Sequence, residues 1–376
     1  MIEVLDPVVG EEEIAMVVAA LRRGEISGTF GDCIPTFERE FAEYCGCEHG
    51  IAVSSGTAAL QLSVAAAGIG PGDEVLVSSS TNIASALAII HNGAIPVPVD
   101  SERMTLNLDL SLIESLITAR TRAIIPVHLY GHPVDMDRLN EIARAHHLIV
   151  IEDCAESHGA TCRGRKTGSF GAMGCFSFYA NKIVTTGEGG MVTTNDSALA
   201  ARLRLLRNLA FTKPRFRHEE AGFNFRMTGY QAAMGVAQVR KIERLIAEKR
   251  RVAATYNHCL ADCEGLQLPS EAAWARNVYW MYTIVVKEEF GIRRDDLMAW
   301  LLERGIDTRT FFCPMNQQPC LRTRSGFRDV PCPVADELWE NGLYLPSTCT
   351  LREETIRTIA GHVKSASARA LSTAGQ

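Results

Sequence analysis

The sequence predicts an α/β protein in two parts, a large domain around a mostly parallel central sheet and a smaller α+β C-terminal domain. Short apolar runs alternate with helical segments over the first two-thirds of the chain, which is typical of a parallel sheet covered on both faces. A helical stretch over 229–256, rich in Ala, Arg, Lys and Glu, then changes the pattern. The 376 residues also exceed what one compact core usually holds.

Each strand expected in the parallel sheet is a short, continuous apolar run. These runs lie at Ile51–Val53, Glu74–Val77, Ile95–Val99, Ala123–Val127 and Leu148–Ile151. Apolar residues at helical spacing, or segments between two such runs, indicate helices at Glu11–Arg23, Gly56–Ala67, Asn82–His91 and Met136–His146. The first of these helices carries Ile14, Val17, Val18 and Leu21 on one face.

The last third of the chain follows an α+β pattern. It has a strand-like run at Val278–Val286, a helical segment at Arg294–Arg304 and a terminal helix from about Leu351. We therefore expect a first domain of residues 1–245, whose N-terminal helix is able to pack on the smaller domain, and a second domain of residues 246–376.

Composition and charge exclude several classes of protein. The formal net charge of -6 argues against a nucleic-acid partner, which would require a basic patch. The first 13 residues show no signal-peptide pattern and no apolar stretch is long enough for a bilayer, so we expect no membrane partner and a cytoplasmic location. The 12 cysteines are scattered and lack paired zinc-site spacing, so we expect reduced thiols and no metal.

Two segments follow predicted strands at their carboxyl ends, where open α/β sheets bind ligands. In the first, Ser55, Gly56 and Thr57 open an Ala-rich helix, whose free backbone N–H groups suit a phosphate, although a simple serine N-cap explains the same residues. In the second, a strand runs into Glu152 and Asp153, and one of these carboxylates could bind magnesium, a ribose or a protonated ring nitrogen. We expect the nearby histidine at position 158 to be a hydrogen-bonded, partly buried side chain.

Two further segments carry isolated polar groups among aromatic residues. Lys182 is the one charged residue in an aromatic and apolar run before the turn Gly187–Gly190. A desolvated lysine has a lowered pKa and can act as a nucleophile or base, although most lone lysines are only solvated. Asn224 and Arg226 lie between phenylalanines and suit either an anionic ligand or an interface loop.

Taken together, these segments supply what pyridoxal 5'-phosphate (PLP) requires. A lysine can form the Schiff base, a carboxylate can keep the pyridine ring protonated, and a helix start can bind the phosphate. A dinucleotide cofactor has weaker support, because no Gly-x-Gly-x-x-Gly follows the first strand, so a nucleotide-binding oxidoreductase is disfavoured.

The order of the motifs resembles the DegT/DnrJ-type sugar aminotransferases. The motifs are Ser-Ser-Gly-Thr-Ala-Ala-Leu at 54–60, Glu-Asp-Cys-Ala-Glu at 152–156, and Phe-Ser-Phe-Tyr-Ala-Asn-Lys at 176–182 with Gly-Glu-Gly-Gly at 187–190. The resemblance covers nearly the whole chain. It implies a fold-type I PLP enzyme that acts on nucleotide-linked keto sugars, as a homodimer with shared active sites.

The resemblance also implies a role for each site residue. Lys182 would form the Schiff base, Asp153 would pair with the pyridine nitrogen, Ala155 would pack on the ring and Glu156 would contact its hydroxyl. The presence of lysine at 182, where related sugar dehydratases have histidine, favours transamination. The residues that would bind the cofactor phosphate are Ser55, Gly56, Thr57 and Ser177, with Asn224 from the other subunit.

Within the family, the runs Pro126–Asp137, Asn224–Thr228 and Gly305–Met315 resemble members that use GDP-4-keto-6-deoxy-D-mannose. The implied reaction moves the amino group of L-glutamate to the C4 ketone of that sugar, with pyridoxamine phosphate as the intermediate form of the cofactor. Arg226, Arg309 and Asn316 are the candidate substrate-binding residues. The implied setting is lipopolysaccharide O-antigen biosynthesis.

Two positions depart from the family pattern. Asn82, a candidate cofactor-binding residue, stands where members usually place an aromatic ring that stacks on the cofactor. Asn316 replaces the histidine that commonly follows the Pro-Met pair of perosamine-type members. Other keto sugars linked to dTDP, UDP or CMP, and keto-cyclitols, therefore stay open as substrates, and a non-catalytic PLP-binding regulator is the alternative of another class.

Overall fold

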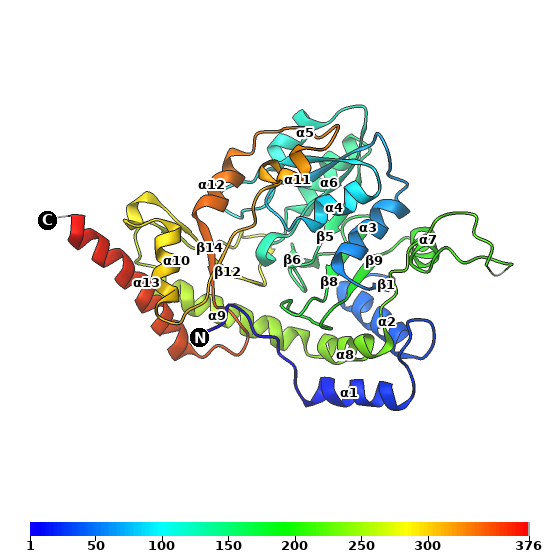
Figure 1. The fold of residues 1–376 in the computed structure, drawn as a ribbon, viewed down its shortest axis with the longest axis horizontal. Helices are drawn as coiled ribbons and strands as arrows, with labels where there is room; N and C mark the ends of the chain where they lie inside the picture. The colour runs from blue at the N-terminus through cyan, green and yellow to red at the C-terminus, as the bar shows by residue number, and fades with distance from the viewer. Residues whose placement is uncertain (215, 375–376) are drawn as a thin grey trace.

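A seven-stranded sheet forms the centre of the larger part of the molecule (Figure 1). The structure is a computed structural model that describes residues 1–214 and 216–374. Strands β8, β5, β4, β2 and β3 run parallel, and β9 is antiparallel to both of its neighbours, β8 and β1. In spatial order the strands are β1 (His49–Val53), β9 (Gly190–Thr194), β8 (Met173–Ser177), β5 (Ile149–Asp153), β4 (Thr121–Ile125), β2 (Glu74–Ser78) and β3 (Ile95–Val99). The predicted α/β class is confirmed.

Helices cover both faces of this sheet, because successive side chains of each strand point to opposite faces. In β2, for example, Val75 and Val77 contribute to one core cluster, whereas Leu76 contributes to another. One face is covered by α3 (Gly56–Ala66), α4 (Ala84–His91) and α7 (Ser197–Arg207). The other face is covered by α2 (Cys33–Cys45), α8 (Gly229–Arg240), α5 (Ile113–Leu116) and α6 (Met136–Ala145).

The smaller part is built on an antiparallel four-stranded sheet with helices packed against it. Its strands, in spatial order, are β10 (Leu266–Gln267), β12 (Tyr282–Val286), β14 (Gly342–Leu345) and β13 (Arg309–Thr310). Its helices are α9 (Ile242–Leu260), α10 (Arg294–Leu302) and α13 (Glu353–Ala374). A third sheet joins β6 (Thr161–Cys162) and β7 (Arg165–Lys166) to β11 (Ala275–Arg276).

The remaining elements are short, apart from the N-terminal helix. They are α1 (Glu11–Arg22), α11 (Pro319–Arg322), α12 (Pro333–Asn341), and the 3-10 turns η1 (Leu110–Leu112), η2 (Leu129–Gly131), η3 (Glu288–Phe290) and η4 (Met315–Gln317). Both α11 and α12 begin with proline, whose fixed backbone angle suits the first helical position.

Two predicted elements differ from the structure in the last half of the chain. The helix expected over 229–256 is two helices, α8 and α9, because the backbone leaves helical geometry at Lys241. The strand expected from Val278 begins only at Tyr282, because the Val278 amide donates to the Gly131 carbonyl and Tyr279 has a φ of 48°. The division proposed at residue 245 falls within α9 and stays a prediction.

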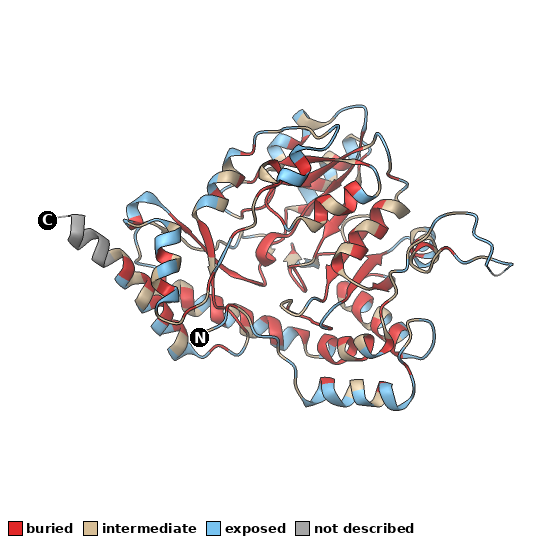
Figure 2. Cartoon of the chain, viewed as in Figure 1, coloured by how far each residue is buried: buried red, intermediate tan, exposed pale blue. Residues whose placement is uncertain are grey.

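The N-terminal helix lies against α8, and this contact replaces its expected packing on the smaller domain (Figure 1). Glu13 of α1 is buried and forms an ion pair with Lys241 at 2.5 Å, which fixes the helix there. The segment before α1 instead reaches the smaller part, where the Ser347 amide donates to the Val4 carbonyl at 3.0 Å. The outer side of α1 is exposed, whereas the strands of the central sheet are buried (Figure 2).

Among the described residues, every helix is either too short or too polar to cross a lipid bilayer.

Candidate active site

Several chain segments meet at one edge of the central sheet. The strands β1, β5 and β8 end there at Val53, Asp153 and Ser177, and the antiparallel strand β9 begins there at Gly190. The carboxyl ends of parallel strands are where open α/β sheets bind ligands. The sequence-predicted acid, the predicted helix start and the segment of the predicted lysine are therefore brought to the same edge.

Asp153 is a buried carboxylate that is held in place by short hydrogen bonds. The Ser85 hydroxyl, on α4, donates to its Oδ2 at 2.8 Å, and the Ala155 amide donates to its Oδ1 at 3.1 Å. Burial raises the pKa of Asp153, while these hydrogen bonds and the charge of Lys182 act in the opposite direction. Each oxygen accepts one hydrogen bond here and can accept another, so the group can pair with a protonated nitrogen.

The neighbouring acid, Glu152, has a structural role. Its oxygens accept hydrogen bonds from the amides of Gly168, Phe170 and Gly171 at 2.9, 2.7 and 2.8 Å, which fix the loop between β7 and β8. It also lies 3.1 Å from Nε2 of His128. The strand pattern left open which acid serves the site, and the resemblance implied Asp153. The hydrogen bonds of Glu152 leave Asp153 as the candidate, and its role stays a prediction.

Glu152 and His128 belong, with Cys154, to a buried group whose ligand atoms are close enough to hold a metal ion. The Val134 amide donates to Nδ1 of His128 at 3.0 Å, so Nε2 carries the proton and donates to Glu152. Both nitrogens of the ring are thereby used in hydrogen bonds, and the imidazole keeps no lone pair for a metal.

Lys182 places its amine beside a second buried carboxylate. Its Nζ lies 3.8 Å from Oε1 of Glu156, and the Tyr130 amide donates to Oε2 of Glu156 at 2.8 Å. Burial lowers the pKa of Lys182 and raises that of Glu156 to about 7, while each charge partly offsets the shift of the other. Asp153, Glu156 and Lys182 thus lie close enough for the charge of each to act on the others, and their roles toward a cofactor stay predictions.

Trp280 forms a wall of this site that the sequence did not reveal. The Lys182 Nζ lies 3.6 Å from the centroid of the Trp280 ring, and the indole N–H donates to the Asn181 carbonyl at 2.8 Å. Tyr130 stacks on the same ring, with 6.4 Å between centroids. Trp280 lies far from Lys182 in the sequence, in an aromatic run that is typical of a buried core. No spacing rule connects the two residues.

The start of α3 faces this group with free hydrogen-bond donors. Ser55 caps the helix by accepting from the Ala58 amide at 3.1 Å, and the amides of Gly56 and Thr57 have no acceptor among the described residues. A Cβ on Gly56 would lie 2.6 Å from the Cβ of Ser177, so only glycine permits this close approach. The structure therefore combines the serine cap with the geometry of an anion site.

The Asn224 segment lies next to the end of β1 in the same chain. The Ser54 amide donates to the Phe225 carbonyl at 2.9 Å, and Arg226 donates from Nη1 to Oδ1 of Asn208 at 2.8 Å. Asn224 itself is exposed. Its amide is therefore available to a second chain, and the predicted role across a subunit interface stays a prediction.

The remaining predicted residues have partners of their own. Asn82 is exposed, and its Oδ1 accepts from the Ala84 amide at 3.0 Å, just before α4. Asn316 is buried, accepts from the Ser79 hydroxyl at 3.1 Å and donates to Asp336 at 3.0 Å. Arg309 is exposed on β13 and forms an ion pair with Asp307. Their roles toward cofactor and substrate stay predictions.

His158 differs from its expected description. It is fully buried between aromatic rings, including Phe176 at 5.7 Å and Phe178 at 5.7 Å, rather than partly buried. Neither ring nitrogen has a hydrogen-bond partner among the described residues, and burial lowers its pKa to about 3. We therefore assign the ring to the packing beneath the site.

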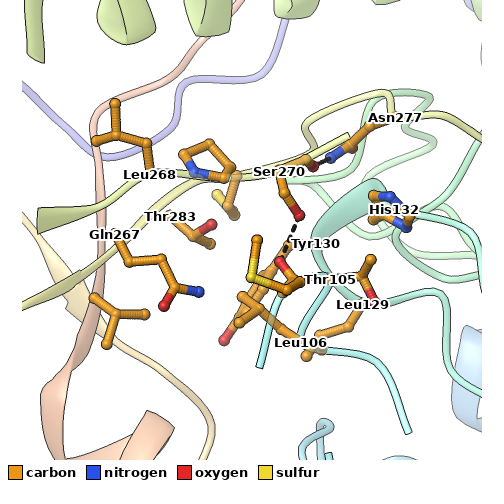
Figure 3. Close-up of a pocket in the computed structure, with 14 residues that line it drawn as sticks. Thr105, Leu106, Leu129, Tyr130, His132, Gln267, Leu268, Ser270, Asn277 and Thr283 are labelled. Atoms are coloured by element: carbon orange, nitrogen blue, oxygen red, sulfur yellow. Dashed lines mark hydrogen bonds between the residues drawn. The ribbon is translucent and has the colours of Figure 1, made fainter. Parts of the chain in front are cut away.

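A separate cavity of about 20 Å³ lies between the 104–106 segment, Tyr130 and the 267–270 segment (Figure 3). The Ser270 hydroxyl donates to the Met104 carbonyl across it. Two ionisable side chains, Tyr130 and His132, line it. His132 donates from Nδ1 to the Pro133 carbonyl at 2.7 Å and accepts the Ala272 amide at Nε2 at 3.1 Å. Both ring nitrogens of His132 are used, and burial raises the pKa of the Tyr130 phenol well above its ordinary value. The site around Lys182 is therefore the candidate active site.

Comparison with known proteins agrees with this geometry. The model of the DegT/DnrJ/EryC1/StrS aminotransferase family matches residues 7–364. The chain is 46% identical over 333 residues to GDP-perosamine synthase from Caulobacter vibrioides, covering 88% of this chain and 89% of that protein. It is 42% identical to dTDP-3-amino-3,4,6-trideoxy-alpha-D-glucose transaminase from Streptomyces venezuelae, covering 82% and 81%.

A solved structure agrees as well. The X-ray structure of DesV from S. venezuelae superimposes with a TM-score of 0.88 at 38% identity, covering 95% of this chain and 94% of that one. The fold, the buried lysine–carboxylate group and these similarities lead to one assignment. The chain is an enzyme and belongs to the DegT/DnrJ/EryC1/StrS aminotransferase family.

Proposed function

We propose that the protein is a PLP-dependent aminotransferase that moves the amino group of L-glutamate to the C4 ketone of a nucleotide-linked 4-keto-6-deoxy sugar. The observation that carries this proposal is the Lys182 amine, largely shielded from solvent, with the buried Asp153 and Glu156 carboxylates and the free amides of α3 at the same sheet edge. An amine with a lowered pKa can form a covalent bond with an aldehyde cofactor and can then move protons.

The residues at the site fit PLP. The amides of Gly56 and Thr57, with Ser55 and Ser177, would hold the phosphate, and Gly56 allows Ser177 to lie close to these amides. Asp153 would hold the protonated ring nitrogen, with Ser85 and the Ala155 amide fixing the carboxylate. The half-buried Ala155 would pack on the ring, and Asn82 stays a candidate contact.

The cofactor supplies an electron sink and a carrier for the amino group when it is bound. The chain's own part is proton transfer and orientation. The Lys182 amine would take the proton from the alpha carbon of glutamate and deliver it to C4′ of the cofactor, and a lowered pKa favours the neutral amine that takes the proton. Glu156, fixed by the Tyr130 amide, keeps a counter-charge 3.8 Å from that amine.

For the sugar, we propose GDP-4-keto-6-deoxy-D-mannose, and therefore GDP-perosamine as the product. The support is the 46% identity to the C. vibrioides GDP-perosamine synthase over most of both chains. The S. venezuelae relative, named for a dTDP-linked amino sugar, makes dTDP-linked keto sugars the main competitor. Arg226 and Arg309 are candidates for the diphosphate, whereas Asn316 has its amide engaged with Ser79 and Asp336.

We further propose a cytoplasmic homodimer with shared sites, which makes an amino sugar for O-antigen synthesis. Asn224 is exposed beside the end of β1, so a second chain can receive its amide at the cofactor phosphate. The exposed apolar side of α1 is consistent with burial between subunits.

A substrate panel tests the proposed function. The purified protein with PLP and glutamate is given GDP-, dTDP- and UDP-linked 4-keto-6-deoxy sugars, and the products are measured by mass spectrometry. We expect an amino sugar from the GDP-linked substrate with kcat/KM at least about tenfold above the others. Preference for a dTDP- or UDP-linked sugar would overturn the substrate, and the absence of any glutamate half-reaction would overturn the transaminase assignment.

A further inference from the structure

The ring of Trp280 covers the amine of Lys182 directly. The Nζ lies 3.6 Å from the ring centroid, and Trp280 is buried, with 3% of the residue exposed. An ammonium group over the face of an indole is attracted by the negative face of the ring, most strongly where water is excluded. The smaller part of the chain thus supplies a contact to the amine through the residues just before β12.

The ring is itself fixed by hydrogen bonding and stacking. Its N–H donates to the Asn181 carbonyl at 2.8 Å, next to Lys182, and Tyr130 stacks on it with 13° between the planes. A Cβ on Gly131 would lie 2.8 Å from the Trp280 amide nitrogen, so the two segments pack without space between them. Tyr130 has a φ of 52°, a left-handed conformation that a non-glycine residue keeps only when its surroundings hold it.

Tyr130 also connects the ring to the carboxylate on the other side of the amine. Its amide donates to Oε2 of Glu156 at 2.8 Å, and Oε1 of Glu156 lies 3.8 Å from the Lys182 Nζ. The amine is therefore held between an aromatic face and a carboxylate that share one supporting residue. A lysine side chain has several rotatable bonds, so its amine can occupy many positions. Holding the amine in one place lowers the entropic cost of orienting it for each step that it performs.

We propose that Trp280 is a positioning residue for Lys182, whose ring and the Glu156 carboxylate form the resting place of the amine whenever it is not bonded to the cofactor. The inference rests on the proposed function, in which the amine is released and recovered in each half-reaction. Trp280 touches neither the substrate nor the reacting carbon in this scheme. It acts by keeping the released amine near the position from which it transfers protons.

Two substitutions separate the ring face from the N–H. Trp280→Phe keeps an aromatic face and removes the donor to Asn181, whereas Trp280→Leu removes the face. The first readout uses the apoprotein and follows the rate at which added PLP forms its covalent adduct with Lys182, by absorbance. We expect Trp280→Leu to slow this step about tenfold and Trp280→Phe to slow it less than about threefold.

The second readout separates positioning from damage to the site. Pyridoxamine phosphate needs no bond to Lys182, so its dissociation constant is expected to stay within about twofold of wild type in both variants. The glutamate half-reaction should lose rate in Trp280→Leu while the KM for glutamate is retained. Trp274→Leu is the matched control, because this tryptophan also has a cation over its ring, Arg163 at 5.6 Å, but lies against His132.

Adduct formation at the wild-type rate in Trp280→Leu would overturn the inference. Equal slowing in Trp280→Phe and Trp280→Leu would also overturn it, because the effect would then come from the N–H group. Weaker binding of pyridoxamine phosphate in the same variants would overturn it too, because Trp280 would then have a structural role. The proposed function fails separately, because in that case wild type itself would form no adduct with PLP.

Discussion

The two sides of the active site are built in different ways. The inner side holds Lys182, Asp153 and Glu156, which are packed among buried groups and hydrogen-bonded within one chain. The outer side holds the α3 amides and Asn224, whose donors are free or exposed. Burial shifts pKa values and so creates reactivity, whereas free donors recognise charge. The comparison teaches that a single chain already fixes the groups whose pKa values are shifted, whereas the donors on the outer side are left without partners. In our proposal, the ligand and a second chain complete the outer side.

The largest effect is expected from removing the amine of the inner side. Lys182→Ala should still bind pyridoxamine phosphate but lose at least about 10³-fold in turnover, because both the covalent bond and the proton carrier are gone. The glutamate half-reaction measures this. Lys249→Met is the matched control, because Lys249 is also buried and burial lowers its pKa to about 8. A comparable loss of turnover in Lys249→Met, or retained turnover in Lys182→Ala, would contradict the assignment of the reactive amine to Lys182.

Two adjacent acids give the next comparison. Asp153→Asn keeps the size of the side chain but removes its charge, so we expect kcat to fall by about 10²- to 10³-fold while the melting temperature is maintained. Glu152→Gln should have the reverse effect. It leaves a backbone amide of Gly168, Phe170 or Gly171 without a good acceptor, which should cost about 1–3 kcal/mol of unfolding free energy with a small change in kcat.

The contrast between Asp153 and Glu152 has a simple readout. Thermal melts and single-turnover rates are measured on both variants. If Glu152→Gln lost activity as strongly as Asp153→Asn at unchanged stability, the assignment of the two acids would be wrong.

The pH dependence of stability tests the burial of Glu156. Its pKa in the folded protein is raised to about 7 by burial, above its ordinary value of 4.5. The folded state therefore binds the proton more tightly than the unfolded state, so this contribution to stability is full below pH 4.5 and is lost as pH rises through about 7.

Urea unfolding of the apoprotein at several pH values measures this contribution. As the pH rises from 4.5 through about 7, the unfolding free energy of wild type should fall by up to about 3 kcal/mol relative to that of Glu156→Gln. The unfolding free energy of Glu156→Gln should therefore vary less with pH. The exposed Glu340→Gln serves as the control. A Glu156→Gln profile that matches wild type would show that the carboxylate is not buried as described.

The smallest effect is expected on the outer side. Asn224→Ala should weaken cofactor binding about tenfold, as expected for loss of one hydrogen bond to a phosphate, with little change in the rate of proton transfer. Equilibrium dialysis of PLP measures this dissociation constant. Mixed dimers of Asn224→Ala and Lys182→Ala chains then test the source of Asn224.

In such a mixed dimer, the Asn224→Ala chain keeps Lys182 and the Lys182→Ala chain keeps Asn224. If Asn224 acts across the interface, one of the two sites therefore contains both intact residues. Tight covalent PLP binding is then restored in one site of each mixed dimer. If the affinity of the mixed dimers stays at the value for Asn224→Ala, Asn224 serves its own chain.

The parts of the site that the sequence revealed share a physical signature. Asp153 ends an apolar strand and Lys182 is alone among apolar residues, so both patterns are visible in a local window. The strands of the parallel sheet were visible for the same reason, and β3 lies at Ile95–Val99 as predicted. Ionisable groups in apolar surroundings stand out because burying a charge is unfavourable unless it is paired or hydrogen-bonded.

The parts that stayed hidden depend on contacts between distant segments. In the sequence, Ser85 is an ordinary helical serine and Trp280 is an ordinary core residue. Only the structure shows that Ser85 donates to Asp153 and that the Trp280 ring contacts the Lys182 amine. The left-handed backbone at Tyr130 is set by packing against 278–280 rather than by its own residue type. Local propensity carries no information about such pairs, so only the tertiary structure shows them.

Reductive trapping tests the central claim most directly. The protein is incubated with PLP, reduced with borohydride and digested, and the modified peptide is identified by mass spectrometry. The account predicts a single pyridoxyl label on the peptide that contains Lys182. A label on the buried Lys249 or on any other lysine, or no label at all, would contradict it.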